Sequence, residues 1–399
     1  MKKAIATLAV LLLPCLAAGQ KAPAPAQVVQ AVRAYRMENE DRIMRELCEF
    51  LAIPNIASDT PNIQKNAAHL MEMLEARGIE THLLPITGRG PVVFGKLLSP
   101  EAKHTVILYA HYDGQPVDPA AWTDGAPFEP LLRNAAIEAG GKRIPFPVNG
   151  AGLRGGYNDD WRIYARSASD DKSPIVALLA ALDALRAKEI PLALNLKVIL
   201  EGEEEAGSPN LQRTLELHKN LLGADLLITA DGPVHQSGRP LVFFGNRGDI
   251  GIDITVYGPL RALHSGHYGN WAPNPAMELS RLLASMKDED GRVLIAGYYD
   301  DVTPLGEVEK KALAAMPDND ADLERELGIA KPEGAGKKLA ELIMEPSLNV
   351  CGLRSAYVGS QAQNVVPDKA EASLDARLVR GEDPQKKFDQ IAGFIRSQG

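Results

Sequence analysis

Three short acidic clusters mark the places in this chain where hydrolytic chemistry could occur. They are His111-Tyr112-Asp113, Asp170-Asp171-Lys172 and Glu201-Gly202-Glu203-Glu204-Glu205. The first and third directly follow apolar runs, and a fourth acid, Asp231, directly follows the apolar run 226–230. Carboxylates and an imidazole at the ends of strands are the ligands that a hydrolytic metal site requires.

The first cluster contains a histidine and an acid two positions apart. Residues two apart in a strand point to the same side, so His111 can bind a metal while Asp113 accepts its other N–H. A surface histidine beside a loop acid is the alternative for this cluster taken alone.

The other two clusters also have simpler interpretations. Capping of the helix predicted from Pro174 explains one of Asp170 and Asp171, which leaves the other free to bridge metals. An acidic run such as 201–205 is usually a solvated surface, but this one follows a buried-looking strand. Packing like charges together is costly unless cations neutralise them. Spacing alone does not choose among the three consecutive glutamates 203–205.

Histidine with several carboxylates suits two divalent ions, Zn²⁺ as well as Mn²⁺ or Co²⁺. Two such ions, about 3.5–4 Å apart, would lower the pKa of a shared water and polarise a carbonyl. A nearby glutamate that is not a ligand would take the proton and pass it to the leaving amine.

Alternating helices and apolar strands must position these residues. We expect an α/β fold with a largely parallel sheet covered by helices on both faces. Ligands bind beyond the carboxyl ends of the strands in such sheets. The expected strands are 81–84, 92–97, 105–110, 194–200 and 226–230, and the expected helices are 28–52, 63–77, 174–188 and 211–222. Residues 131–160 are predicted to form a long loop.

The pattern changes near residue 243, which predicts a second, inserted α+β domain over 243–399 after a catalytic domain over 28–242. Strict alternation over 249–257 is typical of a half-exposed antiparallel strand. Further strands are expected at 349–357 and 370–379, and helices at 275–286, 320–344 and 384–397.

The N-terminus indicates export. Residues 1–19 have the charged start, short apolar core and small residues of a signal peptide, followed by an extended tether at 20–27. A lipoprotein anchored at Cys15 is the alternative. We expect a periplasmic or secreted protein with no integral membrane anchor. The net charge of -9 argues against a nucleic-acid partner. Cys48 and Cys351 are expected to be buried free thiols, although spacing does not exclude a disulfide.

Five stretches together resemble one family: VILYAHYDGQPVD, ARSASDDKSP, ILEGEEEAGS, LLITADGP and LHSGHYGN. The family is that of the co-catalytic di-zinc metallopeptidases, which includes carnosinases, bacterial dipeptidases, glutamate carboxypeptidases, aminoacylases and desuccinylases. The His-Tyr-Asp-Gly-Gln-Pro sequence is most similar to the dipeptidase and carnosinase branch.

The resemblance implies a role for each site residue. His111 and Asp231 would bind one zinc, Asp170 would bridge both ions, and Glu205 would bind the second. Glu204 would be the general base, and Asp113 would orient His111.

In the second domain, a lid and dimerisation domain, the resemblance implies that His264, Asn364 and Arg377 contact substrate within a homodimer. The expected function is hydrolysis of dipeptides or short peptides with a free carboxylate. An N-acyl amino-acid deacylase and a non-catalytic binding protein on the same fold are the alternatives.

Two departures from the family accompany this resemblance. Ser173 replaces a glycine usual after Asp-Asp-Lys, and no histidine follows His267, although relatives supply a last zinc ligand near their C-terminus. We therefore expect a C-terminally truncated chain that lacks part of the catalytic domain and is impaired.

Overall fold

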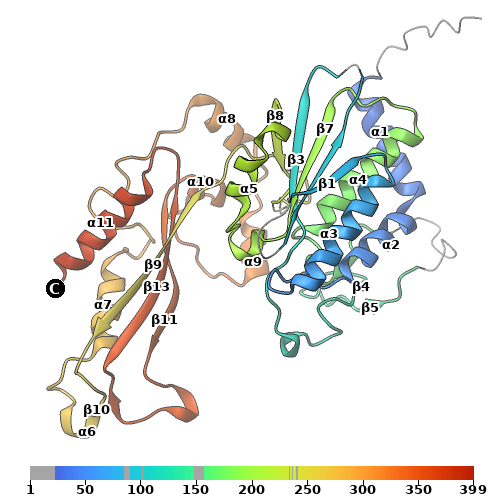
Figure 1. Ribbon diagram of the computed structural model, residues 1–399. Helices are drawn as coiled ribbons and strands as arrows, with labels where there is room; N and C mark the ends of the chain where they lie inside the picture. The colour runs from blue at the N-terminus through green and yellow to red at the C-terminus, as the bar shows by residue number, and fades with distance from the viewer. Residues whose placement is uncertain are drawn as a thin grey trace, which may run out of the picture. The chain divides into compact units, whose positions relative to one another are not determined.

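The computed structural model consists of two compact units, Met1–Gly232 and Pro233–Gly399 (Figure 1). The residues that it describes are 23–84, 90–100, 102–147, 157–232, 234–235, 237–239 and 241–399. The predicted signal peptide and the first residues of the tether lie outside them. No helix in the described ranges is long and apolar enough to cross a bilayer.

The first unit contains a central sheet and a set of covering helices. Its helices are α1 (Pro25–Glu38), α2 (Glu40–Leu51), α3 (Thr60–Glu75), α4 (Lys172–Ala187) and α5 (Leu211–Leu217), with short 3-10 helices η1 (Pro119–Ala121), η2 (Glu204–Ala206) and η3 (Lys219–Leu221). Its strands are β1 (Glu80–Leu84), β2 (Val92–Leu97), β3 (Thr105–His111), β4 (Leu131–Arg133), β5 (Arg143–Ile144), β6 (Arg162–Tyr164), β7 (Asn195–Glu201) and β8 (Leu226–Thr229).

The central sheet has the order β1-β2-β7-β3-β8. Strands β7, β3 and β8 are mutually parallel, whereas β1 and β2 add antiparallel pairings at the other side. The sheet is therefore mixed, and the predicted α/β class is confirmed. Because the three parallel strands run the same way, the residues that follow them meet at one edge of the sheet.

Helices cover both faces of this sheet. One face packs through side chains such as Val198 and Leu200 against Phe50, Leu70 and Leu179 of α2, α3 and α4. Figure 1 shows these helices and α1 together on one side of the strands. On the opposite face, apolar side chains of α5 and η3 pack on a smaller buried cluster: Leu84, Val92, Phe94, Ile107 and Ile199.

Two predictions near the N-terminus are wrong. The single helix expected over 28–52 is two helices, because Asn39 leaves helical geometry at φ −123°, ψ 16°. Its side-chain amide donates to the backbone oxygen of Tyr35 at 2.9 Å, a local hydrogen bond that competes with helix continuation. Residues 25–27, expected as extended tether, form the first turn of α1.

The predicted long loop 131–160 contains regular structure in its described part. β4 lies between β5 and β6 in a small antiparallel sheet. A hydrogen bond from Asn134 N to Lys142 O, at 3.0 Å, closes the turn between the first two strands. Strands of two or three residues are too short to show the alternation that predicts a strand.

The second unit is built on an antiparallel sheet. Its strands are β9 (Gly248–Tyr257), β10 (Leu263–His264), β11 (Ser347–Ser355), β12 (Val365–Val366) and β13 (Lys369–Leu378). Its helices are α6 (Ser265–Tyr268), α7 (Pro275–Ser285), α8 (Glu307–Ala315), α9 (Asp320–Leu327), α10 (Leu339–Leu342) and α11 (Pro384–Ser397), with the 3-10 helix η4 (Gly359–Gln361). The main sheet has the order β11-β13-β9.

One face of this sheet is covered by α7 and α11. Ile252, Ile254 and Leu374 of the strands pack with Leu279 and Ile391 of the helices. The alternation that predicted a half-exposed strand over 249–257 is confirmed, since residues of β9 alternate between this core and solvent.

The prediction of a mostly helical segment over 320–344 is wrong. Only α9 and the short α10 are helical there, and α9 ends at Gly328, whose φ of +68° is left-handed. The preceding helix, α8, was not predicted.

Both described cysteines are free, but only one is shielded from solvent. Cys351 is exposed, contrary to the expectation that both thiols are buried, whereas Cys48 is partly buried. Burial, with a smaller effect of the Glu49 charge, raises the pKa of Cys48 to about 11.

Candidate functional site

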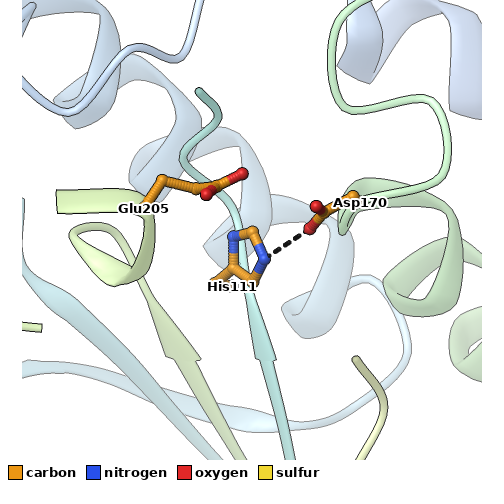
Figure 2. Close-up of side chains that lie close together, drawn as sticks. All are labelled: His111, Asp170 and Glu205. Atoms are coloured by element: carbon orange, nitrogen blue, oxygen red, sulfur yellow. Dashed lines mark hydrogen bonds and ion pairs between the residues drawn. The ribbon is translucent and has the colours of Figure 1, made fainter. Parts of the chain in front are cut away.

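The acidic clusters of the first unit meet at the edge of the sheet where the parallel strands end. His111 is the last residue of β3, and Glu205 lies in η2 just after β7. Asp170 precedes α4, and Asp231 follows β8. Figure 2 shows His111, Asp170 and Glu205 turned toward one another.

Three carboxylates face a single nitrogen of His111. Its Nε2 lies 2.8 Å from Asp170 Oδ1, 3.8 Å from Asp231 Oδ2 and 3.9 Å from Glu204 Oε2. The imidazole is fully buried, whereas Glu204 and Asp231 are 36% and 32% exposed. A neutral imidazole nitrogen can donate only one hydrogen bond, so this convergence of anions favours a bound cation.

Two groups of side chains have ligand atoms close enough to hold an ion. One is His111, Asp170 and Glu205, and the other is His111, Glu204 and Asp231, with all ligand atoms of a group within 4.8 Å. The structure thus brings together every residue of the first unit that was predicted to bind metal. Glu204, expected to be the general base, also lies within ligand distance.

Asp113 links the first cluster to the third. Its carboxylate oxygens accept hydrogen bonds from the backbone N–H groups of Glu204 and Glu205 at 3.1 and 3.0 Å. Its Oδ1 also lies 3.4 Å from His111 Nδ1, on the side of the ring away from Asp170. Asp113 is fully buried, so it can fix the ring of His111 and the start of η2 together.

Asp171 does not cap α4 through its side chain. Its Oδ2 instead accepts a hydrogen bond from the backbone N–H of His111 at 3.2 Å. Burial raises the pKa of Asp171 to about 7, and the charges of Asp231 and Asp170 act in the same direction. The capping alternative for this residue is therefore wrong, because Asp171 ties α4 to the end of β3.

The site concentrates negative charge that protons or a cation must neutralise. Burial opposes the charged imidazole of His111, but the hydrogen bond to Asp113 and the charges of Asp113, Asp171 and Glu204 outweigh it and raise its pKa to about 10. Burial also raises the pKa of the carboxyl groups of Glu204, Glu205 and Asp231. Imidazole and carboxylate oxygens in such a field fit divalent ions, including Zn²⁺.

The second unit brings two of its three predicted site residues together. His264 pairs with Val365 between β10 and β12, and Ser265 N donates to Asn364 O at 3.0 Å. Arg377 lies near the far end of β13, on the order of 25 Å along the strand from its start.

Arg377 also has acidic neighbours in its own unit. Its Nε lies 3.2 Å from Asp375 Oδ2 and 3.9 Å from Asp249 Oδ1. Within the unit the structure therefore places Arg377 apart from His264 and Asn364.

Comparison with known proteins identifies the family. The model for a peptidase dimerisation domain matches residues 244–399. The crystal structure of an M20 family metallo-carboxypeptidase from Sulfolobus solfataricus is similar with a TM-score of 0.72 and 32% sequence identity, covering 90% of this chain and 76% of that chain. The chain belongs to the M20 peptidase family.

Two curated relatives are dipeptidases. The human Beta-Ala-His dipeptidase is 28% identical over 381 residues, which cover 89% of this M20 peptidase and 69% of the relative. A Cys-Gly metallodipeptidase of Candida albicans is 27% identical over 381 residues, covering 90% of this chain and 73% of the relative. These matches confirm the predicted family and its dipeptidase and carnosinase branch, whose members are metallopeptidases.

No role was predicted from the sequence for two residues at or beside the site in this M20 peptidase. Gln115 donates a hydrogen bond from its amide to Glu205. Lys172 is fully buried, and its Nζ donates to Phe50 O at 2.7 Å and Ile53 O at 2.9 Å, while burial lowers its pKa. The sequence does contain an indication for Lys172. A cation at a helix N-terminus is unfavourable in the field of the helix dipole, so a lysine at this position must be stabilised by other contacts.

Proposed function

We propose that this protein is an exported, metal-dependent dipeptidase that hydrolyses dipeptides or short peptides with a free carboxylate. The observation that carries the proposal is the convergence of three carboxylates on His111 Nε2 at the ends of parallel strands. Family membership supports it, because the curated relatives that cover most of the chain are named dipeptidases.

We assign two divalent ions, most consistent with Zn²⁺, to this site. His111 and Asp231 would hold one ion, Glu205 the other, and Asp170 both. When bound, such ions lower the pKa of a water and polarise the substrate carbonyl. The buried Asp113 keeps Nδ1 of His111 engaged, so that Nε2 is the nitrogen left to face the ions.

Glu204 serves as the general base and acid in this proposal. Its carboxylate accepts a proton from the attacking water as the C–O bond forms at the peptide carbonyl. It then delivers that proton to the amide nitrogen as the C–N bond breaks, giving a carboxylic acid and an amine. Burial raises the pKa of Glu204, which brings a carboxyl group closer to the pH at which it can both accept and donate.

Substrate contacts and assembly come from the second unit in this proposal. We assign His264, Asn364 and Arg377 to the substrate, and we propose a homodimer. The match of residues 244–399 to a peptidase dimerisation domain supports the assembly. The pairing of β10 with β12 supports a shared role for His264 and Asn364.

Export to the periplasm or outside the cell is part of the proposal, supported by the sequence of residues 1–19. Mass spectrometry of protein recovered from the outer compartment tests it. An N-terminus near residue 19 or 20 is expected. An intact Met1 on protein retained in the cytoplasm would contradict export, and a lipid on Cys15 would indicate the lipoprotein alternative.

Glu204→Gln, in a version of the protein that extends to the length of its relatives, tests the chemistry. We expect kcat on dipeptides to fall by about 10²–10⁴-fold, with zinc content unchanged, because the amide cannot accept the proton. Glu216→Gln, on the exposed surface of α5, is the matched control and should keep full turnover. Unchanged turnover in Glu204→Gln would refute its role as general base.

A substrate panel tests the activity itself. A zinc-loaded version of the protein that extends to the length of its relatives should hydrolyse dipeptides faster than N-acyl amino acids. Faster hydrolysis of N-acyl amino acids would replace the proposal with a deacylase. A zinc-loaded protein that binds dipeptides without turnover would indicate a binding protein.

A further inference from the structure

Asn55 is a buried residue that lies between the loop that follows His111 and the loop that bears Asp170, called here the His111 loop and the Asp170 loop. It follows α2, in a segment with no predicted metal ligand, and it is 0% exposed. Its side-chain Nδ2 donates to Tyr112 O at 2.8 Å and to Ser167 Oγ at 2.9 Å. One amide group therefore contacts both loops.

The first loop is held on either side of Asp113. Tyr112, whose carbonyl accepts from the Asn55 amide, directly precedes Asp113. Gly114, which directly follows it, donates from its backbone N–H to Asn55 O at 2.9 Å. An isolated bridge between Ile56 and Gly114 continues the pairing. The backbone around Asp113 is thus fixed to the segment after α2.

The second loop is held at Ser167, three residues before Asp170. Ser167 is 4% exposed and has a left-handed φ of 61°, an uncommon conformation for a residue with a side chain. The two loops are also packed closely here, because a Cβ on Gly114 would lie 2.4 Å from Ser167 Oγ. The bond from Asn55 to Ser167 therefore acts at the point where the loops touch.

Small changes in loop separation matter for a metal ligand pair. Two ligand atoms on one tetrahedral zinc, each about 2.0–2.1 Å from the ion, are about 3.3 Å apart. His111 Nε2 and Asp170 Oδ1 lie 2.8 Å apart, about 0.5 Å less than that separation. Groups that bind a metal or substrate must generally be held within roughly 0.5 Å of their productive positions.

We propose that Asn55 is a positioning residue of the metal centre, because its amide sets the separation between the His111 loop and the Asp170 loop. This inference rests on the metal site of the proposed function. Asn55 touches neither the ions nor the substrate in this assignment, and it acts through the backbone of Tyr112 and the hydroxyl of Ser167.

Asn66 provides a matched control for the alternative that Asn55 only stabilises the fold. It is also 0% exposed, and its Nδ2 donates to two acceptors, Pro54 O and Asn62 O, both at 2.8 Å. Among the described residues, the side-chain oxygens of both asparagines lack a hydrogen-bond partner. Asn66 differs in contacting neither ligand-bearing loop through its amide.

The experiment compares Asn55→Leu with Asn66→Leu in the full chain. Leucine has nearly the same shape as asparagine and donates no hydrogen bond. We expect both variants to lower the Tm of the protein in EDTA. Only Asn55→Leu should weaken zinc binding, by about 10–100-fold in competition with a chelating dye. Only this variant should change the visible absorption spectrum of the Co²⁺-loaded protein, which reports ligand geometry.

Asn55→Ser keeps the proposal testable if Asn55→Leu does not fold. A serine hydroxyl can donate one hydrogen bond, so the zinc affinity of Asn55→Ser should lie between those of wild type and Asn55→Leu. If Asn55→Leu does not fold, the zinc affinity of Asn55→Ser should still be clearly below that of wild type. Equal zinc affinity and an unchanged Co²⁺ spectrum in the Asn55 variants would overturn the positioning role and leave the proposed function standing. Failure of the wild-type chain to bind zinc would overturn both.

Discussion

Replacing Asp113 with asparagine separates the two contacts that this residue makes. Asp113→Asn keeps the shape of the side chain but removes its charge and one acceptor. One of the backbone N–H groups of Glu204 and Glu205, now 3.1 and 3.0 Å from a carboxylate oxygen, would face an amide NH₂. The Nδ1 of His111 would also lose its anionic neighbour at 3.4 Å.

The expected cost follows from these contacts. A hydrogen bond to a charged group contributes about 1.5–3 kcal/mol, and a buried donor left unpaired costs about 1–3 kcal/mol. Removing a negative charge from a crowded acidic site offsets part of this loss. We therefore expect the metal-free protein to lose about 2 kcal/mol of unfolding free energy. Zinc affinity should fall by about 10-fold, since Nδ1 of His111 loses the carboxylate at 3.4 Å but keeps the backbone oxygen of Asp113 at 3.2 Å.

Urea denaturation in EDTA measures the first quantity, and competition with a chelating dye measures the second. Asp118→Asn is the control on the same loop, because its carboxylate is exposed and, among the described residues, accepts a hydrogen bond only from Ala120 N, at 2.9 Å. The control should leave zinc affinity unchanged. If Asp113→Asn loses stability but binds zinc as tightly as wild type, Asp113 supports only the start of η2, and its proposed role in orienting His111 is refuted.

Three further outcomes are expected. In EDTA, the unfolding free energy should fall as pH rises from about 4 to about 10, because folding raises the pKa of Asp171 to about 7 and that of His111 to about 10, and the stabilisation from each proton is lost as pH passes through these values. Urea denaturation at a series of pH values measures this fall, and saturating zinc should make it smaller. An unfolding free energy that does not change with pH in EDTA would contradict the prediction. Lys172→Met removes the Nζ donor from Phe50 O and Ile53 O and should lower the Tm in EDTA, at a cost of about 1–3 kcal/mol. A raised Tm would show that burying the cation costs more. Leu279→Ala, in the core of the second unit, should cost about 2–5 kcal/mol of unfolding free energy. The control Leu339→Ala, at a side chain that is 40% exposed, should cost less than about 0.5 kcal/mol. Similar losses in both variants would contradict the placement of Leu279 in this core.

Strong periodicity made much of the fold predictable from the sequence. The apolar runs of β3, β7 and β8 and the helix α4 were expected within a few residues of their observed bounds. The break at Asn39 depends on one side-chain hydrogen bond, and β4–β6 depend on pairings between very short segments. Neither leaves a periodic signal in the sequence.

The site was predictable to the extent that its residues follow strands. His111, Asp170 and Asp231 meet because β3 and β8 are parallel neighbours and α4 begins at the same edge. The contacts around the site were not predictable, since Asn55 contacts two loops distant in sequence and Lys172 contacts the backbone at the end of α2. These contacts form only when the chain folds and brings the segment after α2 next to the loops that follow β3 and precede α4.

The parallel arrangement of β7, β3 and β8 has a consequence for the order of folding events. The ligand groups are spread over residues 111–231 and converge only after strands distant in sequence have paired. Such long-range pairings form slowly, so we expect the metal site to assemble late in folding. Zinc should therefore leave the folding rate nearly unchanged and act mainly by slowing unfolding, which makes metal supply a determinant of the lifetime of the native state.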